Sequence, residues 1–455
     1  KKQTNVDVDL KIYPYETATE RLNLDLNSGD YADVIGGWTL SDNAILTYGV
    51  NQGVFIPLED YFEKYCPNIS AILDLPGVRE KMTAPDGHIY TIPYVCGDTT
   101  VGYSPYINTK WLENVGMSMP TTTDEFEAVL KAFKEQDANG NGDASDEIPF
   151  STDPNNKHIE AMAGYFGLPM NKLGIAIQDE KVVYGGVSNT YREFLSWFHK
   201  LYADGLVDVE LYTQDSSTWE GKGNQDLYGV SIAYGSNEFT GIPAAEERGD
   251  FDSMPVLNTD KGGIWLRDTE GFSVYRTQAV ITNKAEHPEI ICRWFDNAFA
   301  LENGIGCNRG PVGVIVNKED DGYHAIDTTT LSEEDQEKYS WSNLWPQSLP
   351  KYLPADFEFV EEHPMYDEKK ATEEAYEANL TKEIIPSYWI DLDKIDTFSD
   401  TNTAIKDFFE QQQAQFVCGE LDIDNDADWQ AYVDGMYSLG LEDWVATQGI
   451  EEIAK

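Results

Sequence analysis

The sequence predicts an α/β protein built of two lobes. Its 455 residues exceed the size at which a single hydrophobic core keeps growing, so two domains are expected. Near the N-terminus, strand-like and helix-like patterns alternate within about 30 residues, which is typical of a parallel sheet with crossover helices. No Pro- or Ser-rich linker separates the halves, so ordered crossings are expected to join the lobes.

The first three expected elements are a strand, a helix and a strand. Residues 6–15 (VDVDLKIYPY) alternate apolar and polar side chains, as a half-buried strand does. Residues 17–29 (TATERLNLDLNSG) predict a short helix that ends at a glycine. Residues 31–38 (YADVIGGW) read as a short buried strand that ends in two glycines.

The clearest helix covers residues 119–136 (MPTTTDEFEAVLKAFKEQ). Thr122 and Glu125 have the spacing of a capping box. Four apolar residues follow at positions i, i+3, i+4 and i+7 and are expected in the core: Phe126, Val129, Leu130 and Phe133. This helix leads the chain directly into Asp137.

Further helices are expected along the chain. Two are aromatic-rich and amphipathic, 58–66 and 289–304, and the second is expected to end at Gly304. Two are polar, 330–341 and 367–385, and two form a helical C-terminus, 403–420 and 428–440.

The charge of the chain argues against nucleic acid as a partner. There are 32 Lys and Arg against 81 Asp and Glu, a net charge of −49, whereas phosphate binding needs clustered cations. An anionic membrane surface is disfavoured for the same reason. The acidic residues are spread along the whole chain, which predicts a well-hydrated exterior.

The cysteines indicate neither a disulfide scaffold nor a zinc site. There are five, and none has C-x-x-C spacing. We expect most of them to be buried free thiols. A single disulfide between two of them is the alternative.

Residues 137–147 (DANGNGDASDE) resemble a calcium loop. Counted from Asp137, side-chain oxygens fall at positions 1, 3, 5, 7 and 9, and a glycine stands at position 6, as in an EF-hand. The expected ligands are Asp137, Asn139, Asn141, Asp143, Asp146 and Glu147. Position 12 is Ile148, where an EF-hand has a bidentate glutamate, and Pro149 interrupts any second helix. The main hypothesis is a structural Ca²⁺ site, and the alternative is a plain polar loop.

No motif in the chain demands catalysis. H-E-x-x-H, G-x-S-x-G and Walker-type loops are absent, and residues 304–310 (GIGCNRG) have the wrong glycine spacing for a dinucleotide fold. The six histidines form no cluster with metal-ligand spacing. With 81 acidic residues, pairs of carboxylates neither support nor exclude a glycosidase.

Four stretches carry a resemblance to a known family: ATERLNLDLNSGDYADVIGG, IYTIPYV, residues 106–150, and PEIICRWFDNAFALENG. They resemble extracellular solute-binding proteins of carbohydrate ABC importers, in the branch with calcium-binding loops. The resemblance implies a type II periplasmic-binding-protein-like clamshell, with two α/β lobes, a hinge of two or three crossings and closure over a sugar. It also implies delivery of that sugar to an ABC transporter permease.

The resemblance gives provisional lobe boundaries. Lobe 1 would comprise 1–109 and 282–313, and lobe 2 would comprise 110–281 and 314–455. Residues 108–112 (NTKWL) resemble the first crossing, and 271–282 (GFSVYRTQAVIT) resemble the returning strand, so these segments would absorb the hinge rotation. In such proteins a strand and a helix normally precede the segment that resembles residues 4–15, so the first strand of lobe 1 is expected to be missing here.

A sugar pocket combines aromatic platforms with carboxylates, amides and arginine. The residues expected to supply it, chosen from their positions at strand ends or beside glycines, are Trp38, Asp98, Tyr103, Trp219, Tyr234, Trp265 and Arg267. Trp38 follows a strand and two glycines. Trp219 lies among polar residues and glycines, so we expect it to be exposed.

The leading functional hypothesis is a non-catalytic oligosaccharide receptor, with calcium as a structural cofactor. The resemblance further implies an extracellular, lipid-anchored protein of a Gram-positive bacterium, or a periplasmic one if the source is Gram-negative, and a monomer. The alternatives are an extracellular glycoside-processing enzyme and a sugar-binding surface lectin.

Overall fold

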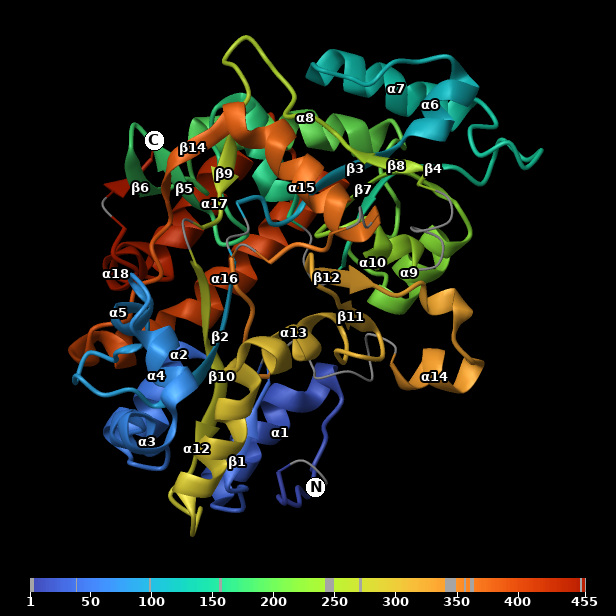
Figure 1. The fold of residues 1–455 in the computed structure, drawn as a ribbon. Coiled ribbons are helices and arrows are strands. Elements are labelled where there is room, and N and C mark those ends of the chain that lie inside the picture. The colour runs from blue at the N-terminus through green and yellow to red at the C-terminus, as the bar shows by residue number, and fades with distance from the viewer. Residues whose placement is uncertain are drawn as a thin grey trace. The chain divides into compact units, whose positions relative to one another are not determined.

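The computed structural model describes residues 4–37, 39–97, 100–154, 158–241, 249–269, 272–339, 349–355, 357–360, 364–450 and 452–454. The chain divides into two compact units. Unit 1 comprises residues 1–98, 271–361 and 387–396, and unit 2 comprises 99–270, 362–386 and 397–455. Each unit contains both helices and sheets, as an α/β protein is expected to (Figure 1).

In unit 1 the structure describes one four-stranded sheet, a hairpin and surrounding helices. The sheet strands are β1 (Val34–Gly36), β2 (Thr91–Gly97), β10 (Phe272–Ile281) and β13 (Lys351–Tyr352), and the hairpin is β11 (Val316–Lys318) with β12 (Tyr323–Ala325). The helices are α1 (Tyr15–Ser28), α2 (Asp42–Ala44), a π-helical turn (Ile45–Asn51), α3 (Glu59–Tyr65), α4 (Pro67–Leu73), α5 (Val78–Met82), α12 (Pro288–Asp296), α13 (Leu301–Arg309) and α14 (Glu333–Lys338).

The sheet of unit 1 has the order β1-β10-β2-β13. Strand β10 runs antiparallel to both β1 and β2, and β13 runs parallel to β2. Strands β1, β2 and β13 therefore point the same way, and their carboxyl ends lie at one edge of the sheet. A register shift between Tyr275 and Ala279 marks a bulge in β10.

Helices α3, α4, α5 and α12 pack on this sheet and share one core. Fully buried residues from helices and strands meet there, among them Phe62, Ile69, Ile92, Ile281 and Phe295. Asp296 at the end of α12 accepts hydrogen bonds from the Ile69 amide (2.8 Å) and the Asn68 side chain (2.8 Å), which fixes the start of α4. The cysteines are free thiols, as expected, and three of them are buried: Cys66, Cys96 and Cys292.

Arg276 on β10 is buried and joins three stretches of unit 1 that are distant in sequence. Its guanidinium donates to both carboxylate oxygens of Asp42, at 2.7 and 2.5 Å. It also donates to the backbone oxygens of Lys81 (3.3 Å), Ser387 (3.3 Å) and Tyr388 (2.8 Å). The ring of Trp389 lies 4.1 Å from the guanidinium carbon, a cation–π contact.

The described residues of unit 2 form three sheets. Their strands are β3 (Ser104–Asn108), β4 (Ile148–Thr152), β7 (Tyr228–Ala233) and β8 (Phe251–Ser253) in the first, β5 (Ile175–Gln178), β6 (Lys181–Tyr184) and β15 (Glu452–Ile453) in the second, and β9 (Trp265–Arg267) and β14 (Leu380–Ile384) in the third. The helices are α6 (Thr109–Val115), α7 (Thr123–Glu135), α8 (Asn189–Ala203), α9 (Ser216–Asn224), α10 (Asn237–Thr240), α15 (Pro364–Tyr376), α16 (Ile395–Cys418), α17 (Asp426–Ser438) and α18 (Leu441–Thr447).

The four-stranded sheet of unit 2 has the order β4-β7-β3-β8. Strand β3 is antiparallel to β7 and β8, and β4 is parallel to β7. The carboxyl ends of β4, β7 and β8 therefore lie at one edge, where β3 begins. This edge positions Tyr103, Asp153 and Tyr234, which directly adjoin the paired strands.

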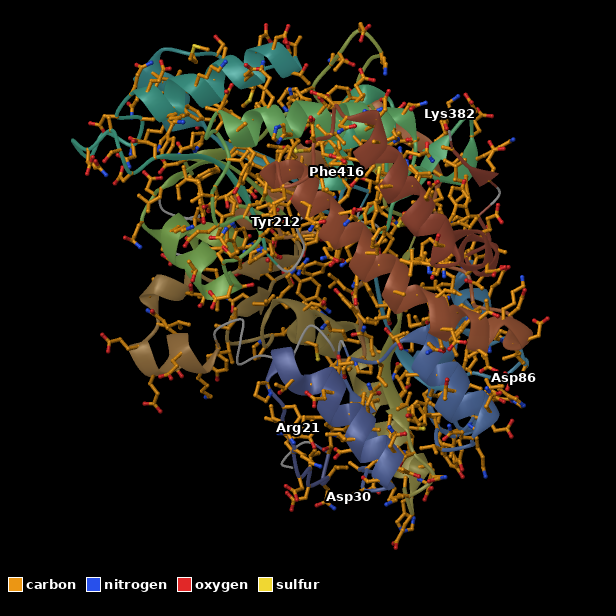
Figure 2. The ribbon with its side chains drawn as sticks, turned by 180° about the vertical axis from the view of Figure 1, so that it is seen from behind. Arg21, Asp30, Asp86, Tyr212, Lys382 and Phe416 are labelled. Carbon is orange, nitrogen blue, oxygen red and sulfur yellow. The ribbon has the colours of Figure 1, made fainter. Side chains whose placement is uncertain are left out.

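The expected helix at residues 119–136 is confirmed as α7. The Glu125 amide donates to the Thr122 hydroxyl at 3.2 Å, and Phe126, Leu130 and Phe133 are fully buried. The Glu125 carboxylate closes the cap one residue earlier than expected, by accepting from the Thr121 amide at 2.8 Å. Phe416, labelled on α16 in Figure 2, belongs to the same large core.

The expected N-terminal strand is wrong. Residues 5–14 have no strand partner among the described residues, and Val8, Leu10 and Ile12 expose 49%, 71% and 80% of their surfaces. The helix and the strand that follow are confirmed as α1 and β1. Helix α1 ends at Gly29 with φ 75°, and its Arg21 projects into solvent (Figure 2).

The expected helix end at Gly304 is also wrong. Helix α12 stops at Asp296, and Gly304 lies inside the next helix, α13. A β-carbon at this glycine would meet the backbone oxygen of Tyr352 at 2.1 Å. Gly304 therefore allows α13 to approach β13 closely and does not act as a stop signal.

The two units differ in extent from the lobes proposed from the sequence. The chain changes unit between 98 and 99 and again between 270 and 271. Residues 108–112, expected to form a crossing, lie in unit 2, and strand β10 lies in unit 1. The lobe boundaries and the hinge crossings remain predictions.

Replacing Arg276 by Met should lower the free energy of unfolding by about 3 kcal/mol or more, because the Asp42 carboxylate and several backbone oxygens then lose a buried charged partner. Urea unfolding followed by tryptophan fluorescence measures this. Arg293→Met is the control, since Arg293 is exposed on α12, and it should change stability by no more than about 0.5 kcal/mol. Equal stability of the two variants would contradict the role of Arg276.

Candidate functional site

The carboxyl edge of the β4-β7-β3-β8 sheet brings together residues from distant parts of unit 2. Ser104 pairs with Ala233, so Tyr103 and Tyr234 stand side by side just beyond the paired strands. Thr152 pairs with Ile232, which places Asp153 at the same edge. Two of the expected ligand residues, Tyr103 and Tyr234, are therefore neighbours.

The aromatic rings at this edge form a compact group. Tyr103 stacks on His158 with centroids 4.1 Å apart and an interplanar angle of 14°. Tyr234 meets Tyr103 edge-on at 6.2 Å and exposes 40% of its surface. His158 adopts a positive φ of 46°, a strained conformation for a non-glycine residue that often marks a functional position. Burial lowers the pKa of His158 to about 3, so this ring is neutral near pH 7.

Lys369 on α15 is the ammonium group at this edge. Its Nζ lies 4.0 Å from the Tyr234 ring centroid and donates to the backbone oxygens of Tyr234 (3.1 Å) and Gly102 (2.5 Å). Burial lowers the pKa of Lys369 to about 8. The hydroxyl of Tyr106 also donates to the Tyr234 oxygen at 3.1 Å, so this turn of backbone is held from two sides.

Glu238 on α10 completes the edge. Its carboxylate accepts a hydrogen bond from the Tyr234 amide at 2.9 Å. Burial raises the pKa of Glu238 to about 7, and repulsion from Asp153 and Glu220 contributes to this rise. We call the group of Tyr103, Asp153, His158, Tyr234, Glu238 and Lys369 the unit 2 edge site.

The unit 2 edge site has the chemistry of a sugar-binding surface. Tyrosine faces pack against the apolar C–H faces of a sugar ring, while carboxylates accept and an ammonium donates hydrogen bonds to its hydroxyls. Asp153 was not among the residues expected from the sequence; it directly follows β4, which pairs with β7. Nothing local in the sequence indicates His158, Glu238 or Lys369.

Unit 1 also presents stacked tyrosines. Tyr94 and Tyr275 face each other across β2 and β10, with centroids 5.3 Å apart and an interplanar angle of 17°. Tyr275 exposes 38% of its surface. Lys351 lies 4.4 Å from the Tyr94 ring centroid, and the Tyr94 hydroxyl donates to Asn308 at 2.9 Å. These aromatic residues were not among those expected from the sequence.

The expected exposure of Trp219 is wrong. The ring exposes 3% of its surface, packs on Phe239 and donates to the Ser231 hydroxyl at 3.2 Å. The polar flanking residues belong to helix α9, which turns Trp219 inward toward β7. The polar residues beside Trp219 in the sequence therefore do not indicate its exposure, because a helix places neighbouring residues on different faces.

Trp265 and Arg267 on β9 also have structural partners. Trp265 exposes 3% of its surface and packs between Tyr165 and Tyr376. Arg267 donates to the Thr381 backbone oxygen (3.2 Å) and to Glu377 (3.1 Å), which ties β9 to the segment that contains β14. Trp38 and Asp98 lie outside the described residues. The glycines before them, Gly36 and Gly97, end parallel strands of one sheet.

The loop 137–147 is bent by hydrogen bonds from its backbone amides to its own side chains. Asp137 accepts from the Gly142 amide at 2.9 Å, which bends the loop around its first position. Asn139 and Asn141 each accept from the amide two residues further on, at 3.0 and 2.7 Å. Glycine is needed at two points, because Gly140 and Gly142 have φ values of 74° and 96°.

Two carboxylate oxygens of this loop are buried without a hydrogen-bond partner, Oδ1 of Asp137 and Oε2 of Glu147. The other oxygen of Glu147 accepts from the Ala138 amide at 2.9 Å, and burial raises the pKa of Glu147. The amide groups of Asn139 and Asn141 donate to Asp146, at 3.2 and 2.7 Å. Unpartnered, buried carboxylate oxygens beside amide oxygens are a donor set that suits a hard dication.

One further group of metal-ligand type occurs among the described residues. Glu319, Asp321 and His324 bring their ligand atoms within 4.8 Å of one another on the β11–β12 hairpin. The two carboxylates are exposed, and His324 is paired to Asp321 at 2.9 Å. The hydrogen bond between His324 and Asp321 accounts for the position of two of these groups without a metal.

A hollow of about 740 Å³ lies along α8 in unit 2, away from the edge site. Its charged lining groups are engaged within the protein: Arg192 with Asp426 at 2.8 Å and Lys200 with Glu127 at 2.8 Å. It therefore offers no free set of polar groups. In the part of the chain that the structure describes, no helix has both the length and the apolar character needed to cross a membrane.

Comparison with known proteins gives a family. The model for bacterial extracellular solute-binding proteins matches residues 1–304. The fructooligosaccharide ABC transporter substrate-binding protein FusA of Streptococcus pneumoniae is 34% identical over 323 residues, which cover 69% of this chain and 59% of that protein. The polygalacturonan/rhamnogalacturonan-binding protein YtcQ of Bacillus subtilis is 28% identical over 141 residues, 31% of this chain and 27% of that protein.

The fold is shared with a solved structure. The S. pneumoniae FusA EF-hand mutant in complex with fructo-nystose aligns with a TM-score of 0.83 at 26% identity, and covers 98% of this chain and 92% of that chain. By sequence, the matched stretches span no more than about three fifths of these curated relatives.

Glu238 gives the fold a measurable pH dependence. The folded protein holds a proton on this carboxyl up to about pH 7, whereas an unperturbed glutamate releases it near pH 4.5. The contribution of Glu238 to stability therefore falls as the pH rises from 4.5 to 7 and is constant above. Glu238→Gln should be more stable than the parent by on the order of 3 kcal/mol at pH 8 and equal to it near pH 4.5.

Urea unfolding of Glu238→Gln at several pH values measures this difference. Glu113→Gln, a change at an exposed site on α6, is the control and should follow the parent at every pH. A difference for Glu238→Gln that does not grow between pH 4.5 and 7 would show that the carboxyl titrates normally.

Proposed function

The chain belongs to the family of bacterial extracellular solute-binding proteins, and from this premise we propose that it is a non-catalytic receptor for an oligosaccharide. It would bind the sugar outside the cell and deliver it to the permease of an ABC transporter. A lipid anchor at the surface of a Gram-positive cell is part of this proposal. The relative FusA, a fructooligosaccharide-binding protein from a Gram-positive bacterium, supports it.

The observation that carries the proposal is the unit 2 edge site. Two tyrosines that approach from different strands, one of them 40% exposed, stand beside a carboxylate and an ammonium group. Open α/β sheets bind ligands at the carboxyl ends of their strands, and this site lies at such an edge. Several aromatic residues were expected from the sequence to act as sugar platforms. Of these, Tyr103 and Tyr234 have the strongest geometric support.

One observation favours the enzyme as a second candidate. Burial and the neighbouring carboxylates Asp153 and Glu220 raise the pKa of Glu238, and the general acid of a glycosidase likewise has a raised pKa and a second carboxylate near it. Incubation of the protein with a bound oligosaccharide, followed by chromatography of the sugar, separates the two. A receptor returns the sugar intact, and an enzyme shortens it.

We also propose that the loop 137–147 holds a Ca²⁺ ion. Asp137 and Glu147 would supply their unpartnered oxygens, and Asn139, Asn141, Asp143 and Asp146 would complete the shell. The loop precedes β4, whereas Asp153 follows it, so the ion would lie roughly 17 Å from the edge site along this strand. Its role would be structural, and the EF-hand named for the relative supports the assignment.

Replacing Tyr234 by Ala should weaken oligosaccharide binding about tenfold, because one exposed ring face is lost from the pocket. Isothermal titration calorimetry with the best sugar from a thermal-shift screen measures the affinity. Tyr437→Ala, which removes a ring of similar exposure (43%) on α17, should leave the affinity unchanged. Equal losses in the two variants would place the pocket elsewhere.

Calcium should raise the melting temperature of the protein, and a chelator should reverse the rise. At a Ca²⁺ concentration 100-fold above its Kd, the stabilisation is about 2.7 kcal/mol, or several degrees. Asp137→Ala and Glu147→Gln should abolish the shift, while Glu135→Gln, an exposed carboxylate at the end of α7, should retain it. A shift that persists in both loop variants would assign the calcium effect to another site.

A further inference from the structure

The names of the relatives point to both neutral and acidic sugars as ligands. One relative is named for a fructooligosaccharide and another for polygalacturonan, a polymer of uronic acid. The unit 2 edge site carries its own information on this point, because its charged groups act directly on anything bound there.

Carboxylates outnumber cations at the edge site and around it. Asp153 and Glu220 act to raise the pKa of Glu238. The carboxylates that act to raise the pKa of Lys369 are Glu238, Asp268, Glu368 and Glu373. Repulsion between them is visible at Glu220, whose pKa is raised first by burial and then by Asp153. A ligand at this edge therefore meets a surface of net negative charge, where neighbouring carboxylates already repel one another.

The nearby cations are already engaged. Lys369 donates to two backbone oxygens, lies on the Tyr234 ring and is attracted by four of the surrounding carboxylates. Arg267 donates to Glu377 and to the Thr381 oxygen. Burial and repulsion from Lys406 lower the pKa of Lys172, while Glu160, Glu410 and Asp153 attract it. Lys406 is itself paired with Glu410 at 3.9 Å. His158 is neutral near pH 7 because its pKa is about 3.

We propose that the oligosaccharide bound at the unit 2 edge site is uncharged, and that Asp153 and Glu238 select it by accepting hydrogen bonds from its hydroxyl groups. This inference rests on the proposed receptor function and specifies its substrate class. A hydroxyl brings a donor, and hydrogen bonds to carboxylates are among the strong ones. A uronate carboxylate brings only acceptors, and like charges in a partly buried site repel.

The test is calorimetric titration of the calcium-loaded protein at pH 7.5 and low salt. The neutral probes are kestose, nystose, cellotetraose and xylotetraose, and the acidic probes are tetragalacturonate and an alginate tetrasaccharide. The fully methyl-esterified tetragalacturonate is also titrated, because it has the sugar units and linkages of its parent but carries uncharged methyl esters in place of the carboxylates. At least one uncharged probe should bind, and each uronate should bind at least 100-fold more weakly than the best of them.

A uronate that binds as tightly as the best neutral sugar would overturn this inference and leave the receptor function standing. Failure of every probe, neutral and acidic, to bind would contradict the receptor function itself, and this inference with it. The two failures are therefore distinguishable.

Ionic strength and a matched pair of variants give an independent check. The affinity for the best neutral sugar should change less than twofold between 20 and 500 mM salt, because no ion pair forms. Glu238→Gln should weaken its binding about tenfold, whereas Glu113→Gln should not. A steep salt dependence, or equal affinities in both variants, would contradict selection by the edge carboxylates.

Discussion

The buried guanidinium of Arg276 is the interaction on which unit 1 depends. Unit 1 is assembled from three separate stretches of chain, and Arg276 in the second binds Asp42 and Lys81 in the first and Ser387 and Tyr388 in the third. Only arginine offers enough donors in a fixed plane to reach a carboxylate and several backbone oxygens together. The short excursion 387–396 is thereby held on unit 1, although the chain on either side of it belongs to unit 2.

The two proposed sites of unit 2 lie at opposite ends of strand β4. The calcium-like loop ends where β4 begins, and Asp153 stands where β4 ends, so one strand connects the metal loop to the edge site. An ion that fixes the start of β4 would fix the register of its far end as well, because β4 pairs with β7 over its whole length. The loop and the sugar surface are then coupled through a rigid element and need not touch.

The sequence predicted what depends on local pattern and failed where distant residues decide. The cap at Thr122 and the apolar positions of α7 follow from spacing alone, as does the order of oxygens in the loop 137–147. Exposure of Trp219 does not, because it depends on which face of α9 meets β7. Glu238 and Lys369 reach the edge site from elements about 130 residues apart in sequence, and only the fold brings them together.

The arrangement around Glu238 also bears on why such a site would bind and not react. A general acid must deliver a proton to a glycosidic oxygen, with a second carboxylate placed on the other side of the bond. Here the Tyr234 amide already occupies one carboxylate oxygen, and the neutral ring of His158 supplies no proton near pH 7. A carboxylate tethered to backbone in this way is a fixed acceptor for a hydroxyl, and it sits on the same turn that carries the Tyr234 ring. Orientation of the acceptor and of the platform is thus set by one piece of backbone, which suits recognition of a sugar by shape and hydroxyl pattern.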